Sequence, residues 1–230
     1  MIEEPIRLTI RRNFARPTPA QVDAFRNLPT GFICDAMDGR GAMDTAIAPV
    51  GPDLPPHAVG VALVADNGPE EILATMGAVH IMQAGDMIVS AVRGGANCSA
   101  AGDQFMGMLK NKGAAGFVTD GPMRDYEGIA EVGLPAWCTG LNPNSPYSNG
   151  PGRVGFGAVV GGQTVNSGDI VVADVNGVVV VPFNRIEAVI AQLANVQAAE
   201  DALEAKVKSG AADMPLVEQM LADGSAVIID

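Results

Sequence analysis

Three charged side chains and one glycine loop are the features of this sequence that could do chemistry. Asp103 is followed, after twenty intervening residues, by the pair Arg124-Asp125, and a loop of sequence Arg-Gly-Gly-Ala-Asn occupies residues 93–97. Aspartates are hard oxygen ligands that suit Mg²⁺ or Mn²⁺. An arginine can bind a carboxylate through two hydrogen bonds or stabilise a developing enolate. The same spacing also fits an ordinary turn salt bridge between Arg124 and a neighbouring acid.

The elements around these residues predict that they meet in one crevice. Residues 87–92 read as a buried strand, residues 99–111 as a helix capped by Ser99, and residues 116–119 as a second strand. A strand–helix–strand unit of this size is a parallel crossover. The helix travels ~18 Å away from the glycine loop, and the second strand returns over about the same distance. Arg124 and Asp125 should therefore lie beside Asp103, at the carboxyl ends of parallel strands, where such sheets bind ligands.

The rest of the chain is expected to form one α/β domain over residues 1–230. Residues 18–43 predict N-terminal helices, because Thr18-Pro19 is an N-cap followed by proline at the first helical position. Residues 59–182 predict a β/α core, and residues 184–230 predict a long helix followed by a short one. The stretch 139–152, rich in Asn, Pro, Ser and Gly, predicts a loop. Runs rich in Val and Ile predict strands at 59–65, 87–92, 116–119, 156–160, 170–173 and 178–181.

The composition excludes several classes of protein. With 26 acidic against 14 basic residues, the net charge is -12, and nucleic-acid binding needs a basic surface. No apolar run approaches the ~20 residues of a membrane helix, and Glu3 and Glu4 stand where a signal peptide carries bases. Cys34, Cys98 and Cys138 have no CxxC spacing and are expected to be free thiols. We therefore expect a cytoplasmic protein.

Rival aldolase chemistries find little support in the remaining residues. A Schiff-base aldolase needs a lysine in an apolar pocket, and all four lysines lie near expected polar helix ends. A zinc aldolase needs several imidazoles, but the only histidines are His57 and His80, and His80 is expected in the core. Cys98 lies near an expected helix N-terminus, where a thiolate is favoured, without a histidine to pair with it. Met106 and Met108 are expected in the core.

Motifs along about two-thirds of the chain resemble those of one family. They are CDAMDG at 34–39, GD at 85–86, GG at 94–95, GFVTDGPMRD at 116–125, GDIVVAD at 168–174 and GVVVVP at 177–182. They resemble the divalent-metal pyruvate aldolases, including 4-hydroxy-4-methyl-2-oxoglutarate / 4-carboxy-4-hydroxy-2-oxoadipate aldolase, which share a superfamily with the regulator of ribonuclease activity A. The resemblance implies a swivelling β/β/α-type domain with N-terminal helices and a long C-terminal helix. It also implies a homotrimer or dimer of trimers, with active sites between subunits.

The resemblance assigns a role to each candidate residue. Asp125 would bind Mg²⁺ or Mn²⁺ directly, Asp103 would hold a metal-bound water, and Arg124 would contact the substrate, so that Asp103 and Arg124 are the implied catalytic residues. Glu200 and Glu204 are the nearest match to acids that a neighbouring subunit's C-terminal helix supplies to the metal through water. A solvated helix face is the alternative for this pair, since their segment departs from the Gly-Glu-x-x-x-Asp pattern. The implied substrate-binding loop consists of Gly95, Ala96, Asn97, Cys98, Ser99, Ala100, Ala101 and Gly102.

The expected function is metal-dependent retro-aldol cleavage of a 4-hydroxy-2-keto acid that releases pyruvate, with decarboxylation of oxaloacetate as a side reaction. The expected partner is a small keto acid, not a nucleic acid or a membrane. Two alternatives stay open: a non-enzymatic regulator of the ribonuclease-regulating type, and a related lyase or decarboxylase for another acid. Asp125 distinguishes an aldolase from the first alternative, because the regulatory branch lacks the metal-binding aspartate. Ala101, where the aldolases carry a larger residue, and the long 139–152 loop leave the substrate open.

Overall fold

A mixed sheet of nine strands forms the centre of the structure, a computed structural model that describes residues 6–229. The strand order is β1-β7-β3-β4-β5-β6-β2, with β10 paired to β3 and β11 paired to β10. A separate hairpin pairs β8 with β9. The strands are β1 (Leu8–Ile10), β2 (Ala48–Pro49), β3 (Ala58–Asp66), β4 (Asp86–Ala91), β5 (Gly116–Thr119), β6 (Ala136–Cys138), β7 (Gly152–Val154), β8 (Gly157–Val160), β9 (Gln163–Asn166), β10 (Ile170–Asp174) and β11 (Gly177–Val181).

Four neighbouring strands, β3 to β6, run parallel and position the candidate residues. All six residues of β4 and all four of β5 are buried, as strands covered on both faces require. This explains their continuous apolar runs. The carboxyl ends of these strands lie at one edge of the sheet, and the segments that follow β4 and β5 carry the glycine loop and Arg124-Asp125.

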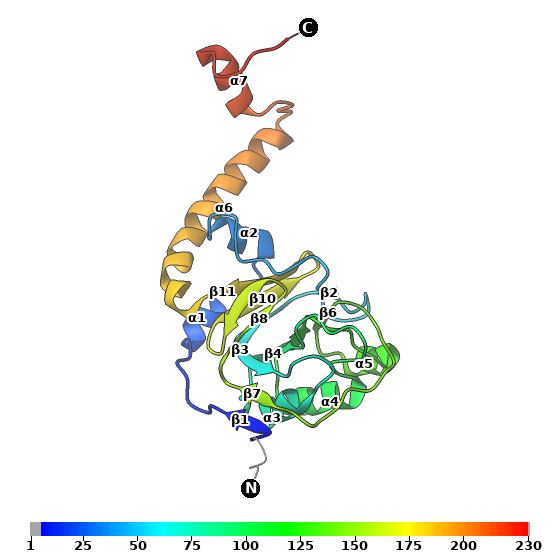
Figure 1. The fold of residues 1–230 in the computed structure, drawn as a ribbon. Helices are drawn as coiled ribbons and strands as arrows, with labels where there is room; N and C mark the ends of the chain where they lie inside the picture. The colour runs from blue at the N-terminus through cyan, green and yellow to red at the C-terminus, as the bar shows by residue number, and fades with distance from the viewer. Residues whose placement is uncertain (1–5, 230) are drawn as a thin grey trace.

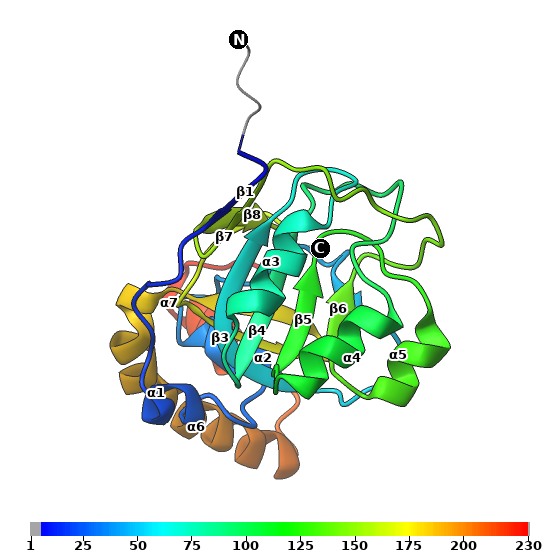
Figure 2. The same ribbon diagram turned by 90° about the horizontal axis from the view of Figure 1, so that it is seen from below.

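Apart from α7, the helices lie in two groups at opposite ends of the sheet. Figure 2 shows α3, α4 and α5 side by side over β3 to β6, whereas α1, α2 and α6 lie near β10 and β11 (Figure 1). The helices are α1 (Pro19–Asp23), α2 (Thr30–Asp35), α3 (Leu73–Ile81), α4 (Asp103–Asn111), α5 (Tyr126–Val132), the 3₁₀ helix η1 (Phe183–Arg185), α6 (Ile186–Lys208) and α7 (Pro215–Asp223). None of the helices in residues 6–229 combines the length and apolar character needed to span a membrane.

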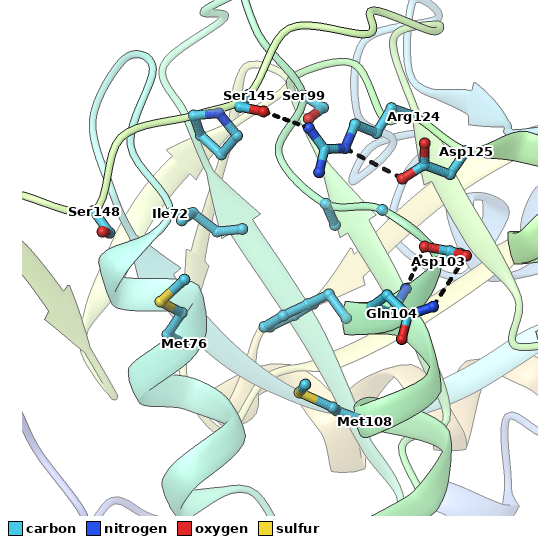
Figure 3. Close-up of a pocket in the computed structure, with 14 residues that line it drawn as sticks. Ile72, Met76, Ser99, Asp103, Gln104, Met108, Arg124, Asp125, Ser145 and Ser148 are labelled. Carbon is cyan, nitrogen blue, oxygen red and sulfur yellow. Dashed lines mark hydrogen bonds and ion pairs between the residues drawn. The ribbon is translucent and has the colours of Figure 1, made fainter.

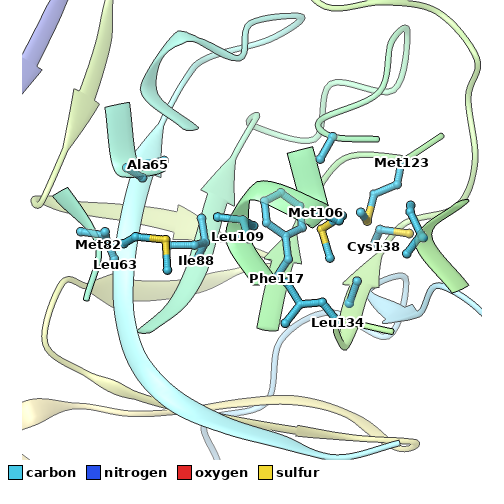
Figure 4. Packing of buried hydrophobic residues seen from close by; sticks show 14 of the residues in the cluster. Leu63, Ala65, Met82, Ile88, Met106, Leu109, Phe117, Met123, Leu134 and Cys138 are labelled. Atoms are coloured by element: carbon cyan, nitrogen blue, oxygen red, sulfur yellow. The ribbon is translucent and has the colours of Figure 1, made fainter. Parts of the chain in front are cut away.

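A buried apolar cluster fixes α4 over the sheet. Met106 and Leu109 of α4 pack in one cluster with Ile88 of β4 and Phe117 of β5, and all four are fully buried (Figure 4). Truncating a leucine in such a site to alanine costs about 2–5 kcal/mol. Leu109 therefore helps to determine where Asp103, at the other end of this short helix, is held.

The C-terminal part of the chain extends away from the sheet. Ile186 and Val189, at the start of α6, are buried against α2 and β11, whereas the outer half of α6 and all of α7 project from the body (Figure 1). Leu203, Val207 and Leu216 are exposed along this arm. We call residues 197–229 the C-terminal arm.

The structure confirms the α/β class, the N-terminal helices and the long C-terminal helix. Thr18 caps α1 in a reciprocal capping box with Gln21, and β4–α4–β5 is a parallel crossover. The expectation that Ser99 caps α4 is wrong, since the helix begins at Asp103 and its N-cap is Gly102. Two core assignments are also wrong, because His80 is exposed at the end of α3 and Met108 is 55% exposed on α4.

Candidate active site

A cavity of about 320 Å³ lies at the carboxyl ends of the parallel strands. Its wall combines the start of α3, the first turns of α4, the segment after β5 and the loop between β6 and β7. Asp103, Arg124 and Asp125 all line it, and Figure 3 shows their side chains on one side of the cavity. The structure thus brings together the three side chains that the crossover lengths place near one another.

The Arg124-Asp125 pair is held in a defined arrangement by three hydrogen bonds. The Arg124 backbone N–H donates to the Ala101 carbonyl at 3.1 Å, its Nε donates to Asp125 Oδ2 at 3.2 Å, and its Nη1 donates to Ser145 Oγ at 2.6 Å. Asp125 has φ 61°, a left-handed conformation that is uncommon outside glycine and that concentrates at functional sites. The pair therefore contains an ordinary salt bridge, and Arg124 also joins the segment before α4 to the β6–β7 loop.

Two glycines leave room for the two carboxylates. A Cβ atom on Gly102 would lie 2.5 Å from Asp125 Oδ2, and a Cβ atom on Gly128 would lie 2.5 Å from Asp103 Oδ2. Gly102 has extended backbone dihedrals that any residue adopts, so contact with Asp125, not backbone conformation, is what favours glycine there. Asp103 also accepts a hydrogen bond from the Gln104 backbone N–H at 2.6 Å.

The glycine loop is organised by Asp120, which follows β5. Its carboxylate accepts hydrogen bonds from the backbone N–H of Val92 at 2.7 Å and of Gly94 at 2.9 Å. Burial raises the pKa of Asp120, although the two N–H groups partly oppose this shift. Asp120 therefore joins the ends of β4 and β5 at the edge of the sheet where the cavity lies.

Only part of the predicted substrate-binding loop lines the cavity. Of residues 95–102, the structure places Ser99, Ala101 and Gly102 in its wall. The backbone N–H groups of Gly95, Ser99 and Ala100 donate to the carbonyls of Val92, Asn144 and Pro122. In the first turn of α4, the Gln104 N–H donates to Asp103 itself. The N–H groups of Ala101 and Gly102 precede this turn, at the end of a helix that favours anions.

Cys98 does not lie at the helix N-terminus, because α4 begins five residues later. Its side chain is buried. Burial raises the pKa of its thiol, and the carboxylates of Glu70 and Glu71 raise it further. The expectation of a favoured thiolate is therefore wrong.

The 139–152 loop contributes more to the site than its composition indicates. Ser145, Pro146 and Ser148 line the cavity, and the amide groups of Asn142 and Asn144 donate to the carbonyls of Ala96 and Asn97 at 2.7 and 2.8 Å. The loop thereby holds the substrate-binding loop and also accepts from Arg124. No local sequence pattern identifies this role, since the partners lie 21 to 47 residues apart.

The opposite side of the cavity is apolar, and sequence reasoning did not find it. Figure 3 shows Ile72 and Met76 at the start of α3 and Met108 on α4. Phe105 of α4 also lines the cavity. The spacing of Phe105 and Met108, three residues apart, indicates only that they share one helix face. Spacing alone does not distinguish a cavity wall from the core.

The donor set near Arg124 suits a hard divalent cation. Mg²⁺ in proteins is held by one or two carboxylates and several waters, and the cavity offers Asp103 and Asp125 without an imidazole or thiolate. Within residues 6–229, no group of three or more His, Cys, Asp or Glu side chains forms a metal cage. Two acids completed by water and substrate therefore fit Mg²⁺ or Mn²⁺ better than Zn²⁺.

Glu200 and Glu204 lie on the C-terminal arm and do not line the cavity of their own chain. Glu204 forms an ion pair with Lys208 at 2.5 Å, with both side chains exposed. Exposed pairs of this kind contribute little to stability. The structure of one chain thus leaves both glutamates on a solvated face.

Comparison with known proteins assigns the chain to a family. The profile of the Aldolase/RraA family matches residues 30–180. A protein of Halalkalibacterium halodurans named "Putative 4-hydroxy-4-methyl-2-oxoglutarate aldolase" is 32% identical over 183 residues, which cover 80% of this chain and 86% of that protein.

Solved structures share the fold. An uncharacterised protein of Pseudomonas syringae has a TM-score of 0.75 at 25% identity, covering 86% of this chain and 93% of the other. A Streptomyces coelicolor protein described as an unusual member of the RNase ES inhibitor RraA protein family has a TM-score of 0.71 at 24% identity, covering 84% and 99%. With the profile match and the sequence relative, these likenesses show that the chain belongs to the Aldolase/RraA family.

Proposed function

We propose that this protein is a divalent-metal-dependent aldolase that cleaves a 4-hydroxy-2-keto acid and releases pyruvate, with decarboxylation of oxaloacetate as a side reaction. The observation that carries the proposal is the meeting of Asp103, Arg124 and Asp125 at one cavity beside the first turn of α4. The name of the Halalkalibacterium relative supports the same reaction class.

Asp125 and Asp103 are the residues that would hold the metal, Asp125 directly and Asp103 through water. A bound Mg²⁺ or Mn²⁺ would act as a Lewis acid toward the keto oxygen of the substrate. Arg124 and Gly102 determine where Asp125 lies, because one donates a hydrogen bond to its carboxylate and the other leaves space beside it.

The chain's own groups bind and orient the keto acid. The backbone N–H groups of Ala101 and Gly102, at the start of α4, would bind the substrate carboxylate, where the helix dipole favours negative charge. The Arg124 guanidinium stabilises the charge that develops on the keto oxygen as the C3–C4 bond breaks. Ser145 holds that guanidinium in place through Nη1.

The working unit proposed is a homotrimer or a dimer of trimers in which Glu200 and Glu204 approach a neighbouring subunit's cavity. The exposed apolar side chains of the C-terminal arm support this assembly, since large unpartnered apolar surfaces mark interaction sites. The projection of the arm away from its own cavity also supports it (Figure 1).

Pyruvate release from a panel of 4-hydroxy-2-keto acids tests the proposal. Activity should disappear after metal removal, return with Mg²⁺ or Mn²⁺, and fall at least ~10²-fold in Asp125→Asn, the scale for one lost charge-stabilising group. Glu127→Gln, which neutralises an exposed acid on α5 outside the cavity, is the matched control. Full activity in metal-free protein, or in folded Asp125→Asn, would contradict the mechanism, and no release from any keto acid would favour a non-enzymatic regulator.

A further inference from the structure

The cavity divides into a charged end and an apolar end, and its charges fall on one side. Asp103, Arg124 and Asp125 form the charged end, while Met76 and Met108 stand on the two facing helices away from Arg124 (Figure 3). Ile72, Phe105 and Pro146 complete the apolar wall. Met76 is 47% and Met108 55% exposed, so both methionines present apolar surface that no part of their own chain covers fully.

From this division we propose that the site selects 4-hydroxy-2-keto acids whose C4 substituent is an uncharged, apolar chain and disfavours those with a second carboxylate at that end. The inference rests on the proposed function and names its substrate class. The substrate's 2-keto acid group would occupy the charged end, and the C4 substituent would lie along Met76 and Met108.

A second carboxylate finds no free cation among the cavity residues of one chain. The neighbouring arm proposed above carries six acidic residues against two lysines, so it would add more negative than positive charge. Arg124 is the sole basic side chain in the wall that residues 6–229 form, and it already faces Asp125 and Ser145. The neighbouring lysines of α4, Lys110 and Lys112, donate to the carbonyls of Val132 and Val79.

A third nearby cation is also engaged elsewhere. Arg7 donates through Nε and Nη2 to the carbonyls of Asn149 and Ser148, at 2.7 Å each, and does not line the cavity. A carboxylate placed against the methionines would therefore be partly desolvated without a partner, which is costly. Two aspartates in the same cavity would repel it as well.

The reach of the apolar wall matches an extended substrate. Met108 lies five residues beyond Asp103 on α4, or ~7.5 Å along the helix axis. A chain of about seven carbon atoms spans a similar distance, since an extended chain advances about 3.6 Å per three bonds. Methionine side chains adapt to ligand shape, so the wall fits a range of aliphatic or aromatic substituents.

The reaction on such a substrate is balanced by the substrate and solvent water. The C4 hydroxyl gives its proton to water, its oxygen forms the carbonyl of the leaving product, and the C3–C4 bond breaks. The electron pair of that bond passes into the enolate of pyruvate, which then takes a proton from water at C3. The other product is an apolar aldehyde or ketone. The charge that develops stays at the Arg124 end, so the apolar end meets no new charge during cleavage.

Binding of two matched, non-cleavable keto acids tests the selectivity without relying on catalysis. Isothermal titration of the full chain with Mg²⁺ should show 2-oxohexanoate binding at least about tenfold more tightly than 2-oxoadipate, the scale of discrimination by an apolar pocket. In Met108→Lys, the ratio of the two dissociation constants should shift about fivefold in favour of 2-oxoadipate. The new lysine can form an ion pair with the second carboxylate, and exposed pairs contribute about this much. Val159→Lys adds the same charge at a 59% exposed residue of β8 outside the cavity and should leave the ratio unchanged.

The outcomes separate this inference from the proposed function. Equal binding, tighter binding of 2-oxoadipate, a Met108→Lys ratio equal to that of wild type, or no binding of either acid overturns the selectivity. Pyruvate release assayed with 4-hydroxy-2-oxohexanoate and 4-hydroxy-2-oxoadipate then tests the aldolase itself. Selective binding without release from either substrate would overturn the aldolase and keep the selectivity. Faster release from the diacid would overturn the selectivity and keep the aldolase.

Discussion

Gly102 and Asp125 are packed so closely that a Cβ atom on the glycine would lie 2.5 Å from the Oδ2 oxygen of the aspartate. The same atom would lie 3.2 Å from Cγ of Arg124. Gly102 is the N-cap of α4, and Asp125 is the N-cap of α5. The contact therefore fixes the distance between the starts of two helices and, with it, the arrangement of both candidate metal-binding acids.

Gly102→Ala is expected to lower pyruvate release at least ~10²-fold while the protein stays folded, because the added methyl group displaces Asp125 and Arg124. Gly107→Ala on the same helix is the control, since its Cβ would meet only Val132 at 3.9 Å. That change should keep activity and raise the free energy of unfolding by about 0.5–1 kcal/mol. Steady-state kinetics and denaturant unfolding measure both. Wild-type activity in Gly102→Ala would show that the packing has no part in the site.

Arg124→Ala is expected to lower kcat at least ~10²-fold, because it removes the donor that faces the developing charge. Arg124→Lys keeps the charge but loses the planar fork, so its kcat should fall between those of wild type and Arg124→Ala. Arg26→Ala, which breaks an exposed ion pair with Asp23 outside the cavity, is the control. Equal activity in all three variants would remove Arg124 from the mechanism.

The meeting of Asp103 with Arg124-Asp125 was predictable because it depends on local lengths. Short, mostly apolar runs identify β4 and β5, and the span between them accommodates one short helix. The start of that helix was not predictable from Ser99. Its hydroxyl donates to the Asn144 carbonyl at 3.0 Å, a long-range contact that outweighs the residue's local tendency to cap a helix.

The apolar end of the cavity could not be predicted, for a different reason. Met106 and Met108 lie two residues apart on α4, yet Met106 is fully buried and Met108 is 55% exposed. Which face of a helix looks into a cavity depends on the elements packed around it, here α3 and the β6–β7 loop. Those elements are distant in sequence, so the residue types and spacing within α4 do not predict which face they leave open.

Asp120 is expected to make stability depend on pH. Because burial raises its pKa in the folded state, its contribution is fully present below the unfolded carboxyl pKa of about 4 and is lost as pH rises through the raised value. Relative to Asp120→Asn, the free energy of unfolding of the wild type should therefore fall with increasing pH over this window. Urea unfolding at a series of pH values measures the difference. If the free energies of unfolding of the two proteins changed in parallel with pH, the raised pKa of Asp120 would be contradicted.

The C-terminal arm provides the last prediction, that active sites are shared between subunits. Glu200 and Glu204 are four residues apart on α6, a spacing at which like charges repel by a few tenths of a kcal/mol, and neither lines the cavity of its own chain.

Asp125→Asn alone and the double variant Glu200→Gln/Glu204→Gln alone should both be weakly active. After subunit exchange in an equal mixture, about a quarter of the sites of a head-to-tail ring would combine an intact cavity with an intact neighbouring arm. Activity should recover toward that fraction, as measured by pyruvate release. A mixture of Asp125→Asn with Glu218→Gln, whose change lies on α7, controls for dilution. No gain in activity after exchange verified by mass spectrometry would place both glutamates on a solvated helix face.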